Sequence, residues 1–401
     1  MQYFDKIHFA PVSIIIPAFH FADSLKNTIN AVENQTIQPG QIIVIDSSND
    51  NEVKDMIDSY TSNVAIVYKK VYRAFPGEAR NLGADLSSQK WLAFLDSKTV
   101  PSHNWIEKYF QIIHDESAEV VFGVTQYIAK TEFQKNIKAA FYGDYGIETT
   151  PGTLIERNVF FKLGRFIEGV RTSDDLEWRD RLKRHNVRCV TPKDISLKYS
   201  DIPNSMYLNI KRFFIYQIHA ISVDVQNKMK DIHLTFFLLL SALIIPRWNA
   251  IVGWKESLLY IPDVTKIYLL SLTSIFFLKL FIDNFFKKKV DSFIFAPFLK
   301  IIVFIVATIM IINWNYAIAK WEENALLYIP HITKIYLLSI LMSSLLYRGV
   351  YFPIKHGITI GYLFPFRWIK VGLFGVILDF SKAPGYIIGA IIYPYRKYIG
   401  K

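Results

Sequence analysis

Cysteine is almost absent from this sequence, since Cys189 is the single one among 401 residues. One thiol excludes a disulfide scaffold and a cysteine metal cluster, and it fits a reducing compartment. Several motifs are also missing: the glycine-rich dinucleotide fingerprint, the Walker A loop, the His-Glu-x-x-His zinc motif and the Gly-x-Ser-x-Gly nucleophile elbow. The first ten residues lack the apolar stretch of a secretory signal peptide, so we expect the first half of the chain to stay in the cytosol.

Acidic residues are scarce in the second half. Up to Asp231 the sequence has 28 basic and 28 acidic residues, whereas from Ile232 onward it has 18 basic and 7 acidic ones. The whole excess of +11 therefore lies among apolar runs. A nucleic-acid-binding protein is expected to carry its basic residues on the folded domain, so this distribution predicts a lipid bilayer as partner and no nucleic acid.

Short β-branched runs alternate with helical patterns in the first half. We expect strands at residues 12–16, 41–45, 64–68 and 91–95, and helices at residues 23–34, 55–60, 77–85 and 105–114. This alternation is typical of βαβ units and predicts a Rossmann-like α/β domain with a mainly parallel sheet. Ligands of such sheets bind beyond the carboxyl ends of the strands. Asp46 and Asp96 each follow an expected strand and are therefore candidate site residues.

Apolar runs dominate the region that follows, at residues 234–245, 267–282, 293–312 and 335–347. Each becomes a credible membrane span when its flanks are included. Residues 258–262 recur as residues 326–330, and residues 265–271 recur as residues 333–339, at the same offset of 68 residues. We therefore predict an α-helical transmembrane domain made of a duplicated two-span unit, with about four spans in all.

The lysine distribution predicts how this domain is oriented. Lys287-Lys288-Lys289 lies between the second and third runs, whereas the two outer loops are nearly balanced in charge. The positive-inside rule then predicts a multi-pass protein of the cell membrane whose first half is cytosolic. The tail, residues 349–401, mixes aromatic and basic side chains, and we expect interfacial helices on the cytosolic leaflet there. A fifth span around residues 369–380 is the alternative.

Six sequence blocks carry a resemblance to a known family. They are residues 13–19, ending in Pro-Ala-Phe; 43–48, ending in Asp-Ser-Ser; 77–83, Gly-Glu-Ala-Arg-Asn-Leu-Gly; 91–98, ending in Asp-Ser-Lys; 164–168, Gly-Arg-Phe-Ile-Glu; and 174–177, Asp-Asp-Leu-Glu. In this order they resemble a family 2 glycosyltransferase of the GT-A fold, over just more than half of the chain. The resemblance implies an inverting enzyme that moves a sugar from a nucleotide diphosphate sugar to a hydroxyl acceptor, either a glycan or a lipid-linked molecule. Cell-surface glycan or polysaccharide synthesis is the expected setting.

The resemblance, the apolar runs and the composition of the tail together give the expected domain boundaries. Residues 1–231 are expected to form a cytosolic GT-A glycosyltransferase domain, residues 232–348 the transmembrane helices, and residues 349–401 the interfacial tail. In a family 2 enzyme one carboxylate of the acidic pair at residues 174–177 takes the proton of the acceptor hydroxyl, and here that position is Asp175. Asp174 beside it is expected to disfavour a second negative charge. The alternative for both is capping of a helix after Ser173.

The same resemblance assigns the rest of the site. It implies that Asp46 holds the donor base, that Pro17 and Phe19 line its pocket, and that Arg80 lies near the base or the phosphates. A turn residue is the alternative for Asp46, and a solvated cation is the alternative for Arg80. The donor-binding set is Pro17, Phe19, Asp46, Arg80 and Asp96, and the acceptor-side set is Glu168, Asp174 and Trp178.

Lys98 departs from the family pattern. The family usually has a second aspartate at this position, and two carboxylates then hold Mn or Mg against the diphosphate. Here Asp96 is the one remaining ligand of that pair, which puts the divalent metal in doubt. We expect the Lys98 ammonium to neutralise the leaving diphosphate itself, as a second catalytic residue.

Two rival functions follow from these observations. The lysine at position 98 also fits a non-catalytic scaffold that binds sugar nucleotides in a membrane glycan assembly. A processive synthase is the other rival, but the Gln-x-x-Arg-Trp motif that holds the acceptor in such enzymes is absent, because Arg367-Trp368 lacks the glutamine.

Overall fold

The computed structural model describes residues 9–185, 187–225 and 341–398. Met1–Lys228 and Leu345–Lys401 form one compact unit, and Met229–Ser344 form a second. Three of the four predicted spans, the repeated segments and the Lys287-Lys288-Lys289 loop lie outside the described residues. The transmembrane domain therefore stays a prediction.

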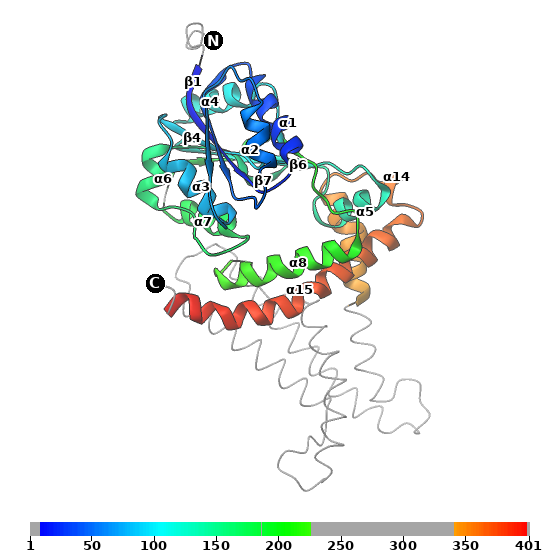
Figure 1. The fold of residues 1–401 in the computed structure, drawn as a ribbon. Coiled ribbons are helices and arrows are strands. Elements are labelled where there is room, and N and C mark those ends of the chain that lie inside the picture. Colours follow the sequence, from blue (N-terminus) through cyan, green and yellow to red (C-terminus); the bar gives the residue numbers. More distant parts are fainter. Residues whose placement is uncertain (1–8, 186, 226–340, 399–401) are drawn as a thin grey trace, which may run out of the picture. The chain divides into compact units, whose positions relative to one another are not determined.

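A mixed sheet lies at the centre of the first unit (Figure 1). Its parallel part consists of β3 (Ile66–Lys70), β2 (Gln38–Asp46), β1 (Phe9–Ala18) and β4 (Trp91–Phe94), in that order. Past β4 the antiparallel strand β7 (Ile147–Glu156) is followed by β6 (Val120–Tyr127), β9 (Leu197–Tyr199) and β5 (Thr99–Pro101), and β8 (Cys189–Val190) pairs with β6. The α/β prediction is confirmed. The expected mainly parallel sheet is a mixed one, because β7 enters the sheet antiparallel to both of its neighbours.

Helices cover both faces of this sheet. Along β1, Ile14 and Ile16 pack in one hydrophobic core and Ile15 packs in the other, because successive side chains of a strand point to opposite faces. The first core includes α1 (Ala22–Glu33), α2 (Glu52–Asp58) and α4 (Trp105–Glu116), and the second includes α3 (Pro76–Asp85), α6 (Arg157–Leu163) and α7 (Asp174–Arg184). The helices predicted in the first half correspond to α1 through α4.

The C-terminal segment packs against two more helices of the same unit, α5 (Glu132–Phe141) and α8 (Met206–Ser222). This segment comprises η1 (Tyr347–Tyr351), α13 (Phe352–Lys355), α14 (Ile360–Leu363) and α15 (Arg367–Tyr398). Two glycines let α15 approach α8 closely. A Cβ at Gly385 would lie 2.7 Å from the carbonyl oxygen of Phe214, and one at Gly389 would lie 2.6 Å from that of Ile218. The tail thus shares a hydrophobic core with the first half of the chain.

A buried ion pair joins η1 to α15 within the C-terminal segment, and the same arginine bonds α5. Nε and Nη2 of Arg348 donate to the two carboxylate oxygens of Asp379 at 2.6 and 2.9 Å, and Nη1 donates to the carbonyl oxygen of Ala140 at 3.1 Å. Lys382 donates to the same carboxylate at 2.9 Å. Paired charge-assisted hydrogen bonds of this kind are strong and directional. The contact therefore fixes η1 and α15 relative to α5.

Asp379→Asn should destabilise the protein by about 3–5 kcal/mol, because removing one partner of a buried ion pair leaves the other charge uncompensated. Thermal unfolding and protease cleavage of the C-terminal segment would measure the effect. The matched control is Asp58→Asn, which breaks the exposed 2.6 Å pair with Lys54 and should change little. Equal losses in the two variants would contradict a fastening role for the buried pair.

Candidate active site

Asp46 lies at the carboxyl end of β2 with its side chain fully buried. Its carboxylate accepts hydrogen bonds from the Ser48 backbone N–H at 2.8 Å and from the Tyr68 hydroxyl at 2.8 Å, and the Lys70 ammonium lies 3.0 Å away. Burial alone would raise the pKa of Asp46, but these donors outweigh it and hold the pKa below its ordinary value. Asp46 is therefore an ionised acceptor at the edge where ligands of such sheets bind.

The loop after β1 brings aromatic side chains to the same edge. Phe19 and Phe21 are about half exposed. His20 and Phe21 have positive φ angles of 58° and 61°, a backbone conformation that residues other than glycine seldom adopt and that is often found at binding sites. The Lys98 ammonium lies 3.4 Å from the centre of the Phe21 ring. Pro17 lies near the end of β1, and the loop that follows with Phe19 and Phe21 thus extends toward Lys98.

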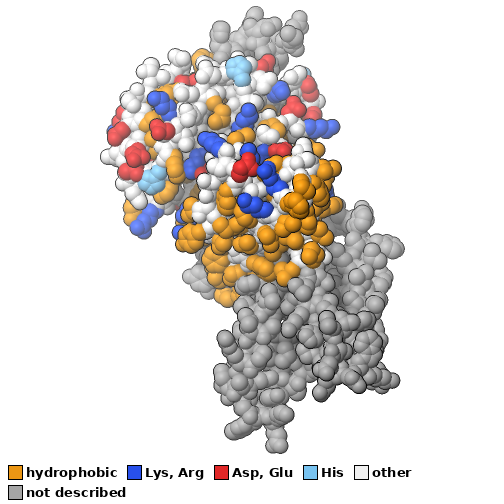
Figure 2. All heavy atoms as spheres, turned by 90° about the vertical axis from the view of Figure 1, so that its right-hand side faces the viewer, with side chains coloured by type: hydrophobic (Ala, Val, Ile, Leu, Met, Phe, Trp, Pro, Cys, Tyr) orange, Lys and Arg blue, Asp and Glu red, His pale blue; other side chains and the backbone are white. Residues whose placement is uncertain are grey.

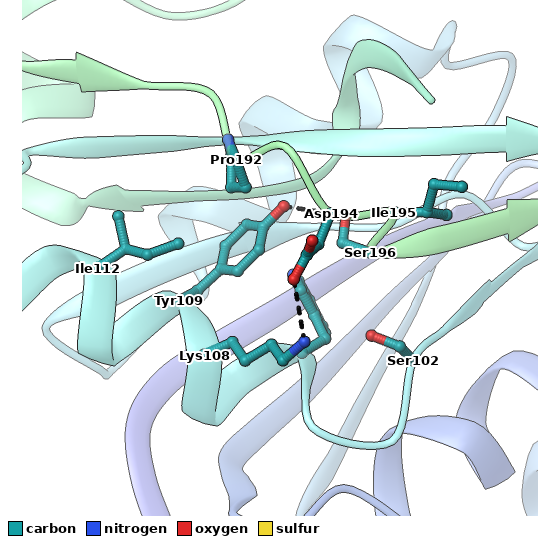
Figure 3. Close-up of a pocket in the computed structure, with 9 residues that line it drawn as sticks. Ser102, Lys108, Tyr109, Ile112, Pro192, Asp194, Ile195 and Ser196 are labelled. Carbon is teal, nitrogen blue, oxygen red and sulfur yellow. Dashed lines mark hydrogen bonds and ion pairs between the residues drawn. The ribbon is translucent and has the colours of Figure 1, made fainter. Parts of the chain in front are cut away.

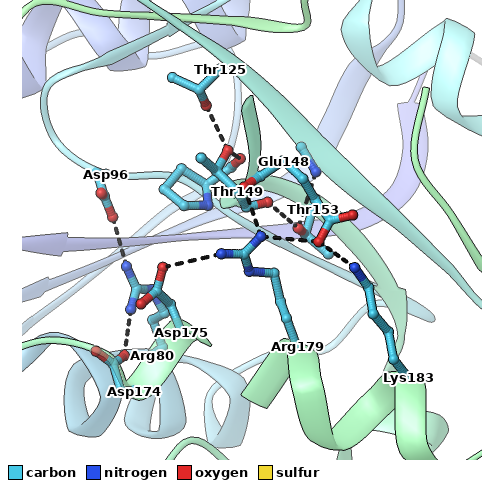
Figure 4. Close-up of polar contacts among 12 residues, drawn as sticks. Arg80, Asp96, Thr125, Glu148, Thr149, Thr153, Asp174, Asp175, Arg179 and Lys183 are labelled. Atoms are coloured by element: carbon cyan, nitrogen blue, oxygen red, sulfur yellow. Dashed lines mark hydrogen bonds and ion pairs between the residues drawn. The ribbon is translucent and has the colours of Figure 1, made fainter. Parts of the chain in front are cut away.

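Arg80 joins three separate segments of the site (Figure 4). From α3, its Nη1 donates to Asp174 at 2.8 Å and its Nη2 donates to Asp96 at 2.8 Å. Arg80 and Asp174 are almost completely buried, whereas the Asp96 side chain is 35% exposed. Burial and, to a smaller extent, the neighbouring carboxylates of Asp175 and Asp96 together raise the pKa of Asp174 to about 7, against the opposing effect of Arg80. Arg80 is thus a buried cation of the site and not the solvated one of the alternative.

Asp175 is the more open member of the acidic pair, with 30% of its side chain exposed. It lies in the first turn of α7, which begins at Asp174 as the capping alternative also predicts. The side chain of Ser173 makes no cap hydrogen bond, and Asp174 is paired with Arg80. Arg179 lies one turn further along, with Nη2 at 4.0 Å from Asp175 and Nη1 at 3.1 Å from Glu148 of β7. A carboxylate in this position is open to a substrate hydroxyl.

The residues around Lys98 do not fit a metal site with two carboxylates. Asp96 is paired with Arg80, and the Lys98 ammonium lies 3.0 Å from Asp201. Within the described parts of the chain, no group of three or more His, Cys, Asp or Glu side chains is placed to hold a metal ion. Asp201 is thus a partner of the candidate residue Lys98, and sequence reasoning missed it because the strand before it, β9, has three residues and no readable pattern.

The acceptor-side residues lie at different depths. Glu168 accepts a hydrogen bond from Asn81 of α3 at 3.0 Å. Trp178 is completely buried among Phe94, Phe160 and Phe166, so its ring packs α7 against the hydrophobic core. Direct contact of Trp178 with an acceptor stays a prediction, as does the acceptor role of Glu168.

A separate hollow contains none of these candidates (Figure 3). It lies between α4 and the segment before β9, where the exposed ion pair of Lys108 and Asp194 spans 3.2 Å. The Tyr109 hydroxyl at its wall donates to the carbonyl oxygen of Phe122. The Lys108–Asp194 pair and the Tyr109 hydroxyl are thus engaged within the protein, whereas Asp96, Asp174 and Asp175 lie elsewhere, around Arg80.

Asp174→Asn should gain stability relative to the wild type as the pH rises from 3.8 to about 7. Asp174 binds its proton more tightly in the folded chain than in the unfolded one, so wild-type stability falls across this window, whereas asparagine does not titrate. Thermal unfolding at a series of pH values measures the difference. Asp180→Asn, on the exposed side of the same helix, is the control for the loss of one carboxylate from α7. A difference between wild type and Asp174→Asn that stays constant with pH would contradict the raised pKa.

Comparisons with known proteins point to one family. The family described as Glycosyl transferase family 2 matches residues 13–172. An uncharacterised glycosyltransferase of Rickettsia bellii is 26% identical over 228 residues, which are 54% of this chain and 33% of that relative. The Escherichia coli UDP-Glc:alpha-D-GlcNAc-diphosphoundecaprenol beta-1,3-glucosyltransferase WfaP is 28% identical over 124 residues, which are 30% of this chain and 48% of that relative. The chain thus spans less than half the length of these two relatives.

One solved structure among those similar to the chain is Staphylococcus aureus TarS 1–349 in complex with UDP-GlcNAc. It is 11% identical, covers 66% of this chain and 80% of that one, and aligns with a TM-score of 0.40. Residues 13–172 are thus similar to family 2 glycosyltransferases, and the family match together with the names of the sequence relatives supports a glycosyltransferase.

Proposed function

We propose that this protein is a membrane-associated inverting glycosyltransferase. It moves a sugar from a nucleotide diphosphate sugar to a hydroxyl acceptor at the cytosolic membrane face, in the synthesis of a cell-surface glycan or polysaccharide. The observation that carries this proposal is the contact of Arg80 with both Asp96 and Asp174, which links one candidate donor-binding residue to the acidic pair that contains Asp175. A relative named for a UDP-Glc donor and a diphosphoundecaprenol-linked acceptor supports a lipid-linked acceptor.

The proposed chemistry is a single displacement. The acceptor oxygen attacks the anomeric carbon and Asp175 takes the proton of that hydroxyl, while the bond from the anomeric carbon to the diphosphate breaks and the nucleoside diphosphate leaves. Asp46 accepts a hydrogen bond from the nucleobase, and Pro17 and Phe19 line that pocket. Charge that develops on the leaving diphosphate requires a preorganised cation, and Lys98 supplies it.

A non-catalytic sugar-nucleotide-binding scaffold is the second candidate. The observation that favours it is the pairing of Lys98 with Asp201, at a place where the family resemblance implies a metal ligand. The two candidates separate on one measurement with the full chain in lipid nanodiscs, which is release of nucleoside diphosphate from a panel of nucleotide sugars, with and without Mn or Mg. Release from none of them would support the scaffold.

The proposed membrane association is supported by α15, which has one buried face and one exposed face. Within the described residues one helix, Arg367–Tyr393, is long and apolar enough to cross a membrane. Its side chains at Val371 and Leu378 are completely buried in cores shared with α5 and α8. A helix docked along a folded domain in this way fits a position at the membrane interface better than a fifth span.

The opposite face of α15 is apolar and exposed. Its exposed aliphatic side chains are Ile369, Leu373, Ile377, Ile387, Ile388 and Ile391. At about 100° per residue they fall within one arc of about 100°, which is the stripe of an amphipathic helix. Figure 2 shows hydrophobic side chains gathered on one part of the described surface, next to a group of Lys and Arg side chains. An apolar stripe beside cations fits the headgroup region of a bilayer with anionic lipids.

Asp175→Asn should lower turnover at least 100-fold and leave donor affinity within about threefold, because it removes proton acceptance without changing shape. Single-turnover sugar transfer and donor titration measure the two quantities. Asp180→Asn is the matched control, since Asp180 also pairs with an arginine four residues on in the same helix. An Asp175→Asn enzyme that kept more than a few per cent of wild-type turnover would rule Asp175 out as the base.

Spin labels at positions 366 and 391 should contact lipid, since Phe366 is 76% and Ile391 is 69% exposed. In a Cys189→Ser background, Phe366→Cys and Ile391→Cys are labelled in full-length protein in nanodiscs containing anionic lipid. At both sites oxygen, which is concentrated in the bilayer, should relax the spin label more strongly than a water-soluble nickel chelate does. At a Tyr72→Cys control in the catalytic domain, the nickel chelate should relax the label more strongly. Nickel accessibility at position 391 equal to that of the control would overturn the interfacial assignment.

A further inference from the structure

Lys98 is held in place by contacts with two side chains. Its ammonium lies 3.0 Å from Oδ1 of Asp201 and 3.4 Å from the centre of the Phe21 ring, and only 21% of its side chain is exposed. Lysine side chains at surfaces are ordinarily flexible, and ordering one costs conformational entropy. Here that cost is met during folding, before any ligand binds.

Asp201 is in turn held by α8. Nη2 of Arg212 lies 3.2 Å from Oδ2 of Asp201, and Nη1 of Arg212 donates to the Asp201 carbonyl oxygen at 2.5 Å. The Tyr199 hydroxyl donates to Oδ2 at 3.2 Å. The Nε of Arg212 donates to the Tyr216 hydroxyl at 2.9 Å, so the guanidinium is bonded on several sides and has little freedom to move. A chain of contacts therefore runs from α8 through Arg212 and Asp201 to Lys98.

Lys98, Arg212 and Asp201 together carry a net charge of +1. Lys98 and Arg212 are two cations on the single Asp201 carboxylate. Because Arg212 neutralises Asp201 from the side away from Lys98, the ammonium keeps an uncompensated charge for an anion. A preorganised charge aimed at a developing anion is worth far more than one that must first be ordered.

We propose that Asp201 is the positioning residue of Lys98 and that Arg212 of α8 holds Asp201 in place, so that this ion-pair chain performs the diphosphate-neutralising task otherwise given to a divalent metal. The inference rests on the proposed function in one respect, namely that Lys98 meets the donor diphosphate. Neither Asp201 nor Arg212 touches the substrate in this account. The competing explanation is that Lys98, Asp201 and Arg212 only hold the end of β9 against α8 and stabilise the fold.

A double-mutant cycle separates the two explanations. Lys98→Met, Asp201→Asn and the double variant are compared with the wild type in full-length protein in nanodiscs, with EDTA present. Lys98→Met should lower kcat about 100-fold and Asp201→Asn about 10-fold, with KM within about threefold of wild type in both. If Asp201 acts only through Lys98, the double variant should match Lys98→Met within about twofold. Multiplication of the two losses would overturn the proposal.

Two further variants guard against loss of folding. Arg212→Lys should retain most of the kcat that Arg212→Gln loses, because it restores the charge beside Asp201. Asp194→Asn breaks the Lys108–Asp194 pair of the hollow in Figure 3 and should leave kcat unchanged. An equal loss of kcat in Arg212→Lys and Arg212→Gln would show that Arg212 only stabilises the fold, and would overturn its role in holding Asp201.

A failure of the proposed function can be told apart from a failure of the positioning role. If the wild type releases no nucleoside diphosphate from any donor, the same cycle is measured as affinity for UDP and GDP by calorimetry without metal. Weaker binding in each single variant and no further loss in the double variant would support the positioning role on its own. Absence of binding to the wild type, or independent losses, would overturn it.

Discussion

The guanidinium of Arg80 is where three distant segments of the chain meet, and the geometry of the site depends on this contact. α3 supplies the arginine, the segment after β4 supplies Asp96, and the first turn of α7 supplies Asp174. The contact is buried, so its hydrogen bonds are electrostatically stronger than they would be in water, and loss of one partner would leave an uncompensated charge. Burial of the Asp174 carboxyl raises its pKa despite the contact with Arg80, whereas the side chain of the adjacent Asp175 is 30% exposed.

The C-terminal segment imposes a second constraint, because it belongs to the same compact unit as the first half of the chain. Arg348 and Asp379 pair within that segment, and Arg348 also bonds the end of α5. The glycines of α15 bring its backbone against α8, and the face turned away from α8 and α5 carries exposed aliphatic side chains. One helix thus has a docked face and an exposed apolar face, which is the pattern of an amphipathic helix.

α8 connects these two regions. It packs along α15, and through Arg212 it reaches Asp201 and hence Lys98. A change at the surface of α15 therefore has a continuous path of packed and hydrogen-bonded groups to the place where the diphosphate is proposed to leave. In the proposed function, these contacts orient Lys98 at a position where the family resemblance implies a metal ligand.

The sequence alone was sufficient for the parallel part of the sheet and for the strand-end aspartates, because β-branched runs buried on both faces and the polar residues after them are local features. It was not sufficient for β7, whose Pro151 and Gly152 suggest a break. In the structure Gly152 has a φ of 86° and its carbonyl oxygen accepts a hydrogen bond from the Trp105 indole.

The pairing of charges was decided by tertiary structure alone. Lys98 and Asp201 are 103 residues apart, and Arg80 and Asp174 are 94 apart. Composition and spacing identify which groups carry charge, but the partner of a charge depends on which loops the packed sheet brings to one edge.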